Sequence, residues 1–260
     1  MTADSGNQSF WEHLDVLRGT LFRIAVVTVV FAVAAFLFKE VLFEVVLAPN
    51  NPDFVTYRLI ARFDPTAEPF AVQLINTGLA DQFMIHMRTA FSVGLLCALP
   101  YGLYQLFRFV SPALYDAERK YVVRVVTASY VMFMTGVAVS YFLIFPLTFR
   151  FLASYQVSTQ IPNTITLQSY ITSLSMMSVA MGAVFEIPIL AWLLAKLGLL
   201  SSEFMSRYRR HAVVVILVLA AVITPTADVF TLLMVSLPMW LLYEAAISIV
   251  RRTTSINNSI

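Results

Sequence analysis

The stretch TAFSVGLLCALPYGLYQLF, from Thr89 to Phe107, contains 19 residues and no charged side chain. As a helix it is about 28 Å long, because an α-helix rises about 1.5 Å per residue. The hydrocarbon core of a bilayer is about 30 Å thick, so this stretch can cross it. We therefore predict a transmembrane helix here.

The composition of the whole chain agrees with a lipid environment. Of its 260 residues, 59% are hydrophobic and only 12% are charged, and the mean hydropathy is +0.79. Soluble proteins carry about 25% charged residues, so half of the charge that a normal surface needs is missing. The net charge of +2 argues against a nucleic-acid binder, and the single cysteine, Cys97, excludes a disulfide scaffold. We predict an all-α polytopic membrane protein.

Six apolar runs are candidates for membrane spans. They cover residues 24–47, 89–107, 125–149, 169–195, 211–224 and 229–250. The fifth run is only about 21 Å long as a helix, so a buried or interfacial helix is its alternative. A helical hairpin across a thinned bilayer fits better, because only the short polar break 224–228 separates the last two runs. The chain is then a single membrane domain, 1–260, with a lead-in at 1–23 and a tail at 251–260.

Lysine and arginine are distributed unequally between the two predicted sides. The predicted cytoplasmic side carries twelve of the 17: Arg18, Arg23, Arg108, Arg119, Lys120, Arg124, Lys196, Arg207, Arg209, Arg210, Arg251 and Arg252. By the positive-inside rule, this side faces the cytoplasm, together with both termini. A cleaved signal peptide is the alternative for the amino terminus, but the acids Asp4, Glu12 and Asp15 precede the first arginine, where a signal peptide needs basic residues.

Glu186 lies deep in the fourth apolar run, where a carboxylate costs at least a few kcal/mol unless it is protonated, paired or hydrated. Pro188 follows two residues later and cannot donate to the helical hydrogen-bond ladder, so a bend beside the acid is expected. Pro146 and Pro238 predict further kinks. Together these residues indicate a concave, partly hydrated wall. The alternative is a protonated Glu186 that hydrogen-bonds a neighbouring helix for structure alone.

The remaining polar residues point away from enzymatic chemistry. Asp228 precedes the last apolar run and is placed to cap its helix. Glu244 lies near the cytoplasmic end of that run, within reach of the interface. The three histidines have no metal-ligand spacing, and no nucleophile elbow, Walker loop, dinucleotide fingerprint or HExxH motif occurs. We expect no enzyme activity, metal or cofactor.

Two acidic segments lie on the otherwise basic cytoplasmic face. Glu118 belongs to the loop 109–120, and Glu12 and Asp15 lie on the polar side of an amphipathic helix predicted over 10–18. Carboxylates accept guanidinium groups in a bidentate manner, so these segments favour a cationic partner, arginine above all. The alternative is that the acids only balance nearby Arg18 and other basic residues.

These segments belong to a series of motifs that extends over essentially the whole chain. The motifs are His13-Leu14-x-x-Leu17-Arg18, Leu103-Tyr104-Gln105, Phe109-x-x-Pro112-Ala113-Leu114-Tyr115-x-x-Glu118-Arg119, Phe185-Glu186-x-Pro188, Thr224-Pro225 with Asp228, and Pro238 with Tyr243-Glu244. In this order they resemble the TatC subunit family of the twin-arginine protein translocase. The motif that ends at Glu118 and Arg119 is the most specific of them.

The resemblance implies a receptor in the cytoplasmic (inner) membrane, shaped like a cupped hand of six kinked helices. Such a receptor binds twin-arginine signal peptides of folded cargo and exports the cargo with the single-span subunits TatA and TatB, in an oligomeric complex that uses the proton-motive force. By motif match, the signal-peptide site comprises Glu118, Phe109 and Pro112, with Asp15, Glu12 and Arg18 on the lead-in. The resemblance also places Glu186 and Pro188 at an intramembrane cavity, and Pro49, Thr224, Pro225 and Asp228 at the outer side, where partner helices approach.

Two positions depart from the family pattern. Val16 stands where the family usually has a glutamate, so Asp15 or Glu12 has to replace it or the site relies on Glu118. Leu232 stands where a polar residue often follows Asp228, which affects the predicted partner contact. A proton-coupled small-solute transporter with Glu186 as proton carrier is the alternative function, although the two halves lack the matching repeats that such transporters commonly have.

Overall fold

A computed structural model gives the fold of residues 10–63, 70, 72–110, 122–156, 158, 163–224, 226 and 228–257. The helices of the first half are α1 (Phe10–Leu37), α2 (Lys39–Leu47), the 3-10 turn η1 (Ala48–Asn50), α3 (Val55–Phe63) and α4 (Asp81–Val110). Those of the second half are α6 (Val122–Val139), the π-helical turn η3 (Ser140–Ile144), α7 (Phe145–Ser154), α8 (Leu167–Phe185), α9 (Ile187–Lys196), α10 (Ser202–Arg207), α11 (Arg209–Ile223) and α12 (Val229–Asn257). Two short strands, β1 (Leu74–Ile75) and β2 (Ile165–Thr166), complete the described elements.

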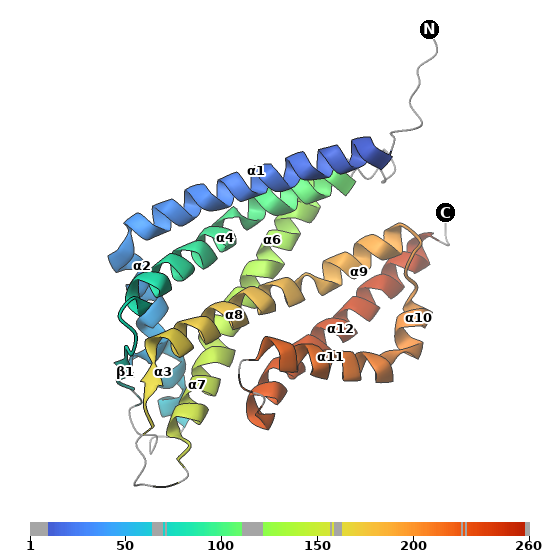
Figure 1. The fold of residues 1–260 in the computed structure, drawn as a ribbon. Coiled ribbons are helices and arrows are strands. Elements are labelled where there is room, and N and C mark those ends of the chain that lie inside the picture. The colour runs from blue at the N-terminus through green and yellow to red at the C-terminus, as the bar shows by residue number, and fades with distance from the viewer. Residues whose placement is uncertain are drawn as a thin grey trace.

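Helix α8 lies at the centre of the bundle. Nine of its 19 residues are buried, and Tyr170, Met177 and Met181 are part of the main hydrophobic core. The other helices are arranged around it, with α1 and α4 on one side and α11 and α12 on the other (Figure 1). A second, smaller core joins α9, α10 and α12. The helical architecture predicted from the sequence is therefore confirmed.

Glycines allow two pairs of helices to approach closely. A Cβ atom on Gly94 of α4 would lie 2.5 Å from the backbone nitrogen of Ala32 in α1, and one on Gly136 of α6 would lie 2.5 Å from the carbonyl oxygen of Met181 in α8. Side chains larger than hydrogen do not fit at these distances. As a result α1 runs along α4 for most of its length (Figure 1).

The bundle has two distinct ends. At one, which we call the termini end, α1 begins, α4 ends, α6 begins and α9 and α12 end, close to both chain termini (Figure 1). At the other, which we call the cap end, lie α2, α3, α7 and the two strands (Figure 1). Which of these ends faces the cytoplasm stays a prediction.

In the part of the chain that the structure describes, five helical segments are long and apolar enough to cross a membrane. They are Leu14–Leu37, Asp81–Leu106, Val123–Ser154, Leu167–Lys196 and Val229–Thr253. The predicted fifth of the six spans, 211–224, corresponds to α11, which has only 15 residues. The chain is thus a membrane protein with several apolar helices.

Helix breaks occur at some of the prolines. Glu186 separates α8 from α9, with Pro188 in the first turn of α9. Pro146 lies at the start of α7, directly after the π-helical turn η3. Pro238 and Pro100, by contrast, lie inside the continuous helices α12 and α4. A further break at Phe38, where no proline occurs, divides α1 from α2.

The sequence pattern over Phe70 to Met87 predicts a helix along the outer surface, and this prediction was wrong before residue 81. Leu74 and Ile75 form strand β1, which pairs in parallel with Ile165 and Thr166 of β2. The Asn50 side chain donates to the carbonyl of Val72 at 2.9 Å and accepts from its amide at 3.2 Å. These contacts satisfy the backbone in an extended conformation. Helix α4 begins only at Asp81, whose carboxylate accepts from the Gly78 amide at 2.7 Å.

Candidate functional site

Asp15 and Arg18 lie exposed on the first turns of α1, at the termini end. They are three residues apart and therefore share one side of the helix. Because α1 packs along α4, this segment lies beside the last turns of α4, which ends at Val110. Helix α6 begins at Val122 at the same end (Figure 1). The structure thus brings the acidic lead-in close to both helix ends that border residues 111–121.

Several predicted site residues lie outside the described part of the chain. Glu118 and Pro112 belong to residues 111–121, and Pro225 lies in the break between α11 and α12. The backbones of Glu12 and Phe109 lie in α1 and α4, but their side chains are outside the described set. Their roles stay predictions.

Glu186 connects α8 to α9 in the interior of the bundle. Its side chain is only 9% exposed. Its backbone carbonyl accepts from the amides of Ile189 and Leu190 at 3.0 and 2.9 Å, so the chain turns into α9 without losing those bonds. The carboxyl group lies beside the fully buried hydroxyl of Ser129 on α6. Among the described residues, Glu186 Oε1 has no hydrogen-bond partner, which is uncommon for a buried polar atom and calls for water or a ligand.

Two cavities lie within the spanning part of the bundle. One, of about 340 Å³, is lined by Pro188 and Trp192 of α9, Arg124 of α6 and Ile249 of α12. The other, of about 270 Å³, lies among α2, α4, α6 and α8 and carries the hydroxyl groups of Thr89, Ser92, Ser175 and Ser178. In the described part of the chain Glu186 lines neither of these two cavities. Pro188 does contribute to the first.

Thr224 and Asp228 form the polar break between α11 and α12. The Thr224 hydroxyl is buried and donates to the carbonyl of Ala220 at 2.9 Å, at the end of α11. The Asp228 carboxylate accepts from the Thr231 amide at 2.7 Å and caps α12, which confirms the predicted cap. Burial alone would raise the pKa of Asp228, but the hydrogen bonds that the carboxylate accepts, with the Thr231 amide foremost, hold this pKa below its usual value.

Pro49 lies in a different part of the molecule from this break. It is buried in η1 at the cap end, where its carbonyl accepts from the Tyr57 hydroxyl at 3.0 Å. The same hydroxyl lies 3.3 Å from the carbonyl of Pro146. Pro49 therefore holds η1 against α3 and α7. Its predicted role near partner helices stays a prediction.

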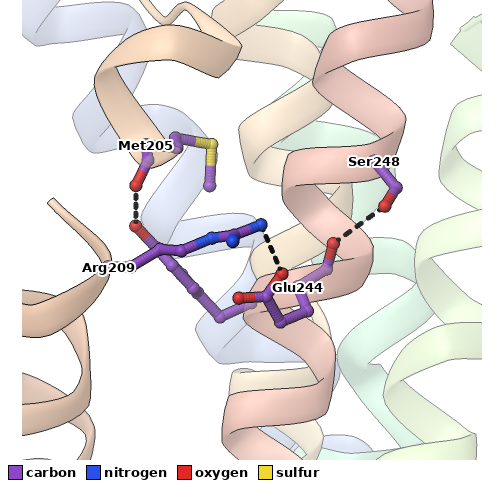
Figure 2. A network of polar contacts seen from close by, with 5 residues as sticks. Met205, Arg209, Glu244 and Ser248 are labelled. Carbon is purple, nitrogen blue, oxygen red and sulfur yellow. Dashed lines mark hydrogen bonds and ion pairs between the residues drawn. The ribbon is translucent and has the colours of Figure 1, made fainter. Parts of the chain in front are cut away.

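The structure also contains a polar contact that the sequence reading missed. Glu244 of α12 forms an ion pair with Arg209 at the start of α11, with 2.9 Å between Oε2 and Nη2 (Figure 2). The neighbouring Tyr243 hydroxyl donates to the carbonyl of Met205 in α10 at 2.9 Å. The helix dipole is positive at the amino terminus, so a carboxylate is favourable there. The Glu244 carboxylate therefore compensates the positive charge at the start of α11. Because 35 residues separate the pair, no local spacing predicts it.

The long apolar helices and the buried polar groups between them define a polytopic integral membrane protein. The family model for the Sec-independent protein translocase protein (TatC) matches residues 12–238, and the chain belongs to this family. It is therefore a component of a protein translocase, and the family is not enzymatic. This membership argues against the small-solute transporter that the sequence left as an alternative.

Relatives and solved structures agree with the family. The chain is 34% identical over 247 residues to TatC of Desulforapulum autotrophicum, covering 95% of this chain and 86% of that protein. It is 31% identical over 259 residues to TatC of a Blattabacterium from Periplaneta americana, covering 96% and 97%. A crystal structure of the twin arginine translocase receptor TatC superposes with a TM-score of 0.76 at 30% identity, covering 94% of this chain and all of that chain.

Proposed function

We propose that this chain is the receptor subunit of a twin-arginine translocase and binds the paired arginines of signal peptides at its termini end. The observation that carries the proposal is the position of Asp15 and Arg18 beside the ends of α4 and α6, which border the segment containing Glu118. Carboxylates from two segments would then face one pocket for guanidinium groups. Folded cargo is exported from this side with the proton-motive force.

The proposed topology has six spans, with both termini in the cytoplasm and the chain in the inner membrane. Both described terminal helices begin or end at the same end of the bundle, which supports an even number of spans (Figure 1). Helix α11 is then a short fifth span, and the mismatch of its 15 residues with the bilayer is relieved by local thinning. Basic residues at the termini end, such as Arg108, Arg124 and Arg252, support its cytoplasmic position.

The proposed partners are the single-span subunits TatA and TatB, in an oligomeric complex. Helix α11 exposes a row of large apolar side chains and buries only Ile216 and Ala220 within the chain. A face of this kind fits lipid or a single partner helix. The break at Thr224, Pro225 and Asp228 is proposed as the partner contact. The Glu186 carboxyl, whose Oε1 atom has no partner among the described residues, is proposed as a polar feature of the interior.

The test of the receptor role is photocrosslinking of a twin-arginine signal peptide to membranes that contain the chain and its partners. We expect Glu118→Gln to lower the yield about tenfold or more, because one charge-assisted hydrogen bond contributes about 1.5–3 kcal/mol. Glu203→Gln, an exposed acid in α10, is the matched control and leaves the yield unchanged. Equal crosslinking in both variants would contradict the assignment of Glu118.

The two lead-in acids are distinguished in the same assay. We expect one of Asp15→Asn and Glu12→Gln to weaken crosslinking, since Val16 offers no carboxylate. If neither variant has an effect while Glu118→Gln does, the site depends on the Glu118 segment alone. The assay is repeated with a signal peptide whose paired arginines are replaced by lysines, which cannot make bidentate contacts. With this peptide, the part of the difference in crosslinking yield between the variants and the unmodified chain that depends on bidentate contacts should disappear.

A further inference from the structure

A polar cavity at the cap end takes no part in the proposed receptor site. It has a volume of about 390 Å³ and lies where α2, α4 and α8 begin. The residues that line it are Lys39, Phe43, Gln82, Phe83, His86 and Leu167. Helix α2 thus contributes one cation to this space, α4 contributes one amide and one imidazole, and α8 contributes the apolar Leu167.

His86 is the most informative residue of this cavity. It is only 8% exposed, and its Nε2 atom has no hydrogen-bond partner among the described residues. The ring stacks on Phe36, with 4.0 Å between centroids and an interplanar angle of 9°, and Phe43 meets it edge-on at 5.5 Å. The two phenylalanines hold the imidazole in place without offering Nε2 a hydrogen bond. A buried polar atom of this kind normally has a partner.

The charges around the cavity favour an anion. The Lys39 ammonium group is exposed at its rim, and the first turns of α4 and α8 face it through Gln82 and Leu167. Helix amino termini attract anions because their first amide groups are unpaired and the helix dipole is positive there. Two groups reduce this effect: the Asp81 carboxylate lies in the first turn of α4, where it accepts from the Gly78 amide, and the Thr166 hydroxyl accepts from the Ser169 amide at the start of α8. The Lys39 cation is therefore the main attraction for an anion. Glu40 and Glu44 are exposed acids on the same helix as Lys39, but neither lines the cavity.

The position of the cavity favours a lipid over a free ion. Lys39 is the first charged residue after the apolar segment that ends at Leu37, so it lies at the membrane boundary. Leu37, Phe38 and Phe83 beside it expose large apolar side chains. Lysine at such a boundary meets lipid head groups, and apolar side chains meet the acyl chains.

We propose that this cavity binds the phosphate group of a phospholipid, with Lys39, His86 and the Gln82 amide as donors and the acyl chains along Phe38 and Phe83. The lipid fixes the angle between α1 and α2 at Phe38 from outside the protein. The proposal requires a membrane location of the chain and does not depend on the proposed receptor role.

The test is native mass spectrometry of the full chain in detergent, delipidated and then incubated with phosphatidylglycerol. We expect one saturable lipid adduct, with affinity lowered about tenfold by Lys39→Gln, the change expected for one charge-assisted contact. Arg58→Gln, another exposed cation at the cap end, is the matched control and keeps the affinity. His86→Asn is the second variant and is expected to weaken the adduct as well. Because Lys39 is exposed, its variant keeps the fold.

Two further arms identify the source of the phosphate. Diacylglycerol with the same acyl chains is expected to give no specific adduct, and millimolar inorganic phosphate is expected not to displace the phospholipid. Equal affinity of the Lys39→Gln and Arg58→Gln variants would overturn the proposal. Retention of diacylglycerol to the same extent as phosphatidylglycerol would also overturn it, because the site would then bind acyl chains alone. Binding of inorganic phosphate without retention of any phospholipid would overturn it as well.

Discussion

The aromatic cap and the α10–α11 arm are attached to the rest of the bundle in opposite ways. The aromatic cap is the cluster formed by Phe54, Tyr57, Phe70, Tyr141, Phe142, Phe145, Phe149 and Tyr170. Its rings contact one another at centroid distances of 4.8 to 6.2 Å. Tyrosine hydroxyls from three of its members also donate to backbone carbonyls of other elements, at Pro49, Val45 and Val46.

The α10–α11 arm, residues 202–223, has few such contacts. Only Ile216 and Ala220 of α11 are buried. The arm is held at its start by the Arg209–Glu244 ion pair and the Tyr243–Met205 hydrogen bond (Figure 2). An exposed ion pair contributes only about 0–1 kcal/mol. The arm, which is otherwise anchored through Met205 in the smaller core, can therefore be displaced at lower cost than the cap.

The largest effect is expected for Tyr57→Ala in the aromatic cap. This change removes a buried ring and the two carbonyl contacts to Pro49 and Pro146. Truncation of a large buried aromatic side chain costs about 3–5 kcal/mol. We expect a marked drop in the thermal unfolding temperature of the purified chain in detergent.

Tyr155→Ala is the control for this change, because Tyr155 lies at the same end but is 66% exposed. Its unfolding temperature should stay close to that of the unmodified chain. An equal drop in unfolding temperature in the two variants would show that the aromatic cap is not more firmly held than its surroundings.

A smaller effect is expected for Asp228→Ala, which removes the cap of α12. Loss of an amino-terminal cap costs about 1 kcal/mol. Since the folded chain lowers the pKa of Asp228, the stabilisation is present above the ordinary aspartate pKa of about 3.9 and is lost as the pH falls below it. As the pH is lowered from 7 to 3, the free energy of unfolding of the unmodified chain should therefore approach that of the alanine variant.

Asp228→Asn tests whether this difference is electrostatic. Asparagine caps helices about as well as aspartate but does not titrate, so this variant should keep its stability on acidification relative to the alanine variant. An alanine variant that is as stable as the unmodified chain at pH 7 would mean that the contact to the Thr231 amide does not hold α12.

The sequence predicts those parts of the structure that depend on local patterns. Apolar runs of about 20 residues identify the long helices because the bilayer requires that length. The cap by Asp228 follows from an acid placed just before an apolar run. The break beside Glu186 follows from Pro188, which cannot continue the hydrogen-bond ladder. Each of these features is decided within a few residues.

Features that depend on partners distant in sequence could not be predicted. The helical spacing from Phe70 onward is overridden by Asn50, whose side chain holds Val72 extended from 22 residues away. The cavity at His86 exists only because α2, α4 and α8 begin at one place. The acidic site at Glu118 was inferred from a motif, and its geometry lies outside the described residues.

The smallest effect on stability and the clearest one on conformation are expected at the Arg209–Glu244 pair. The two side chains are 48% and 29% exposed, so Glu244→Gln should cost only about 0.5 kcal/mol. The start of α11 then loses its compensating carboxylate, and the arm should separate from α12. Spin labels at Val214 and Leu241, both exposed, report this as a broader distance distribution.

The exchanged pair Arg209→Glu with Glu244→Arg is the control. It should narrow the distance distribution again, because it restores the attraction between the two side chains. If Glu244→Gln leaves the distribution unchanged, the Tyr243–Met205 hydrogen bond and the apolar contacts of Met205, Ile216 and Ala220 are enough to hold the arm. The contrast with the aromatic cap is then one of degree only.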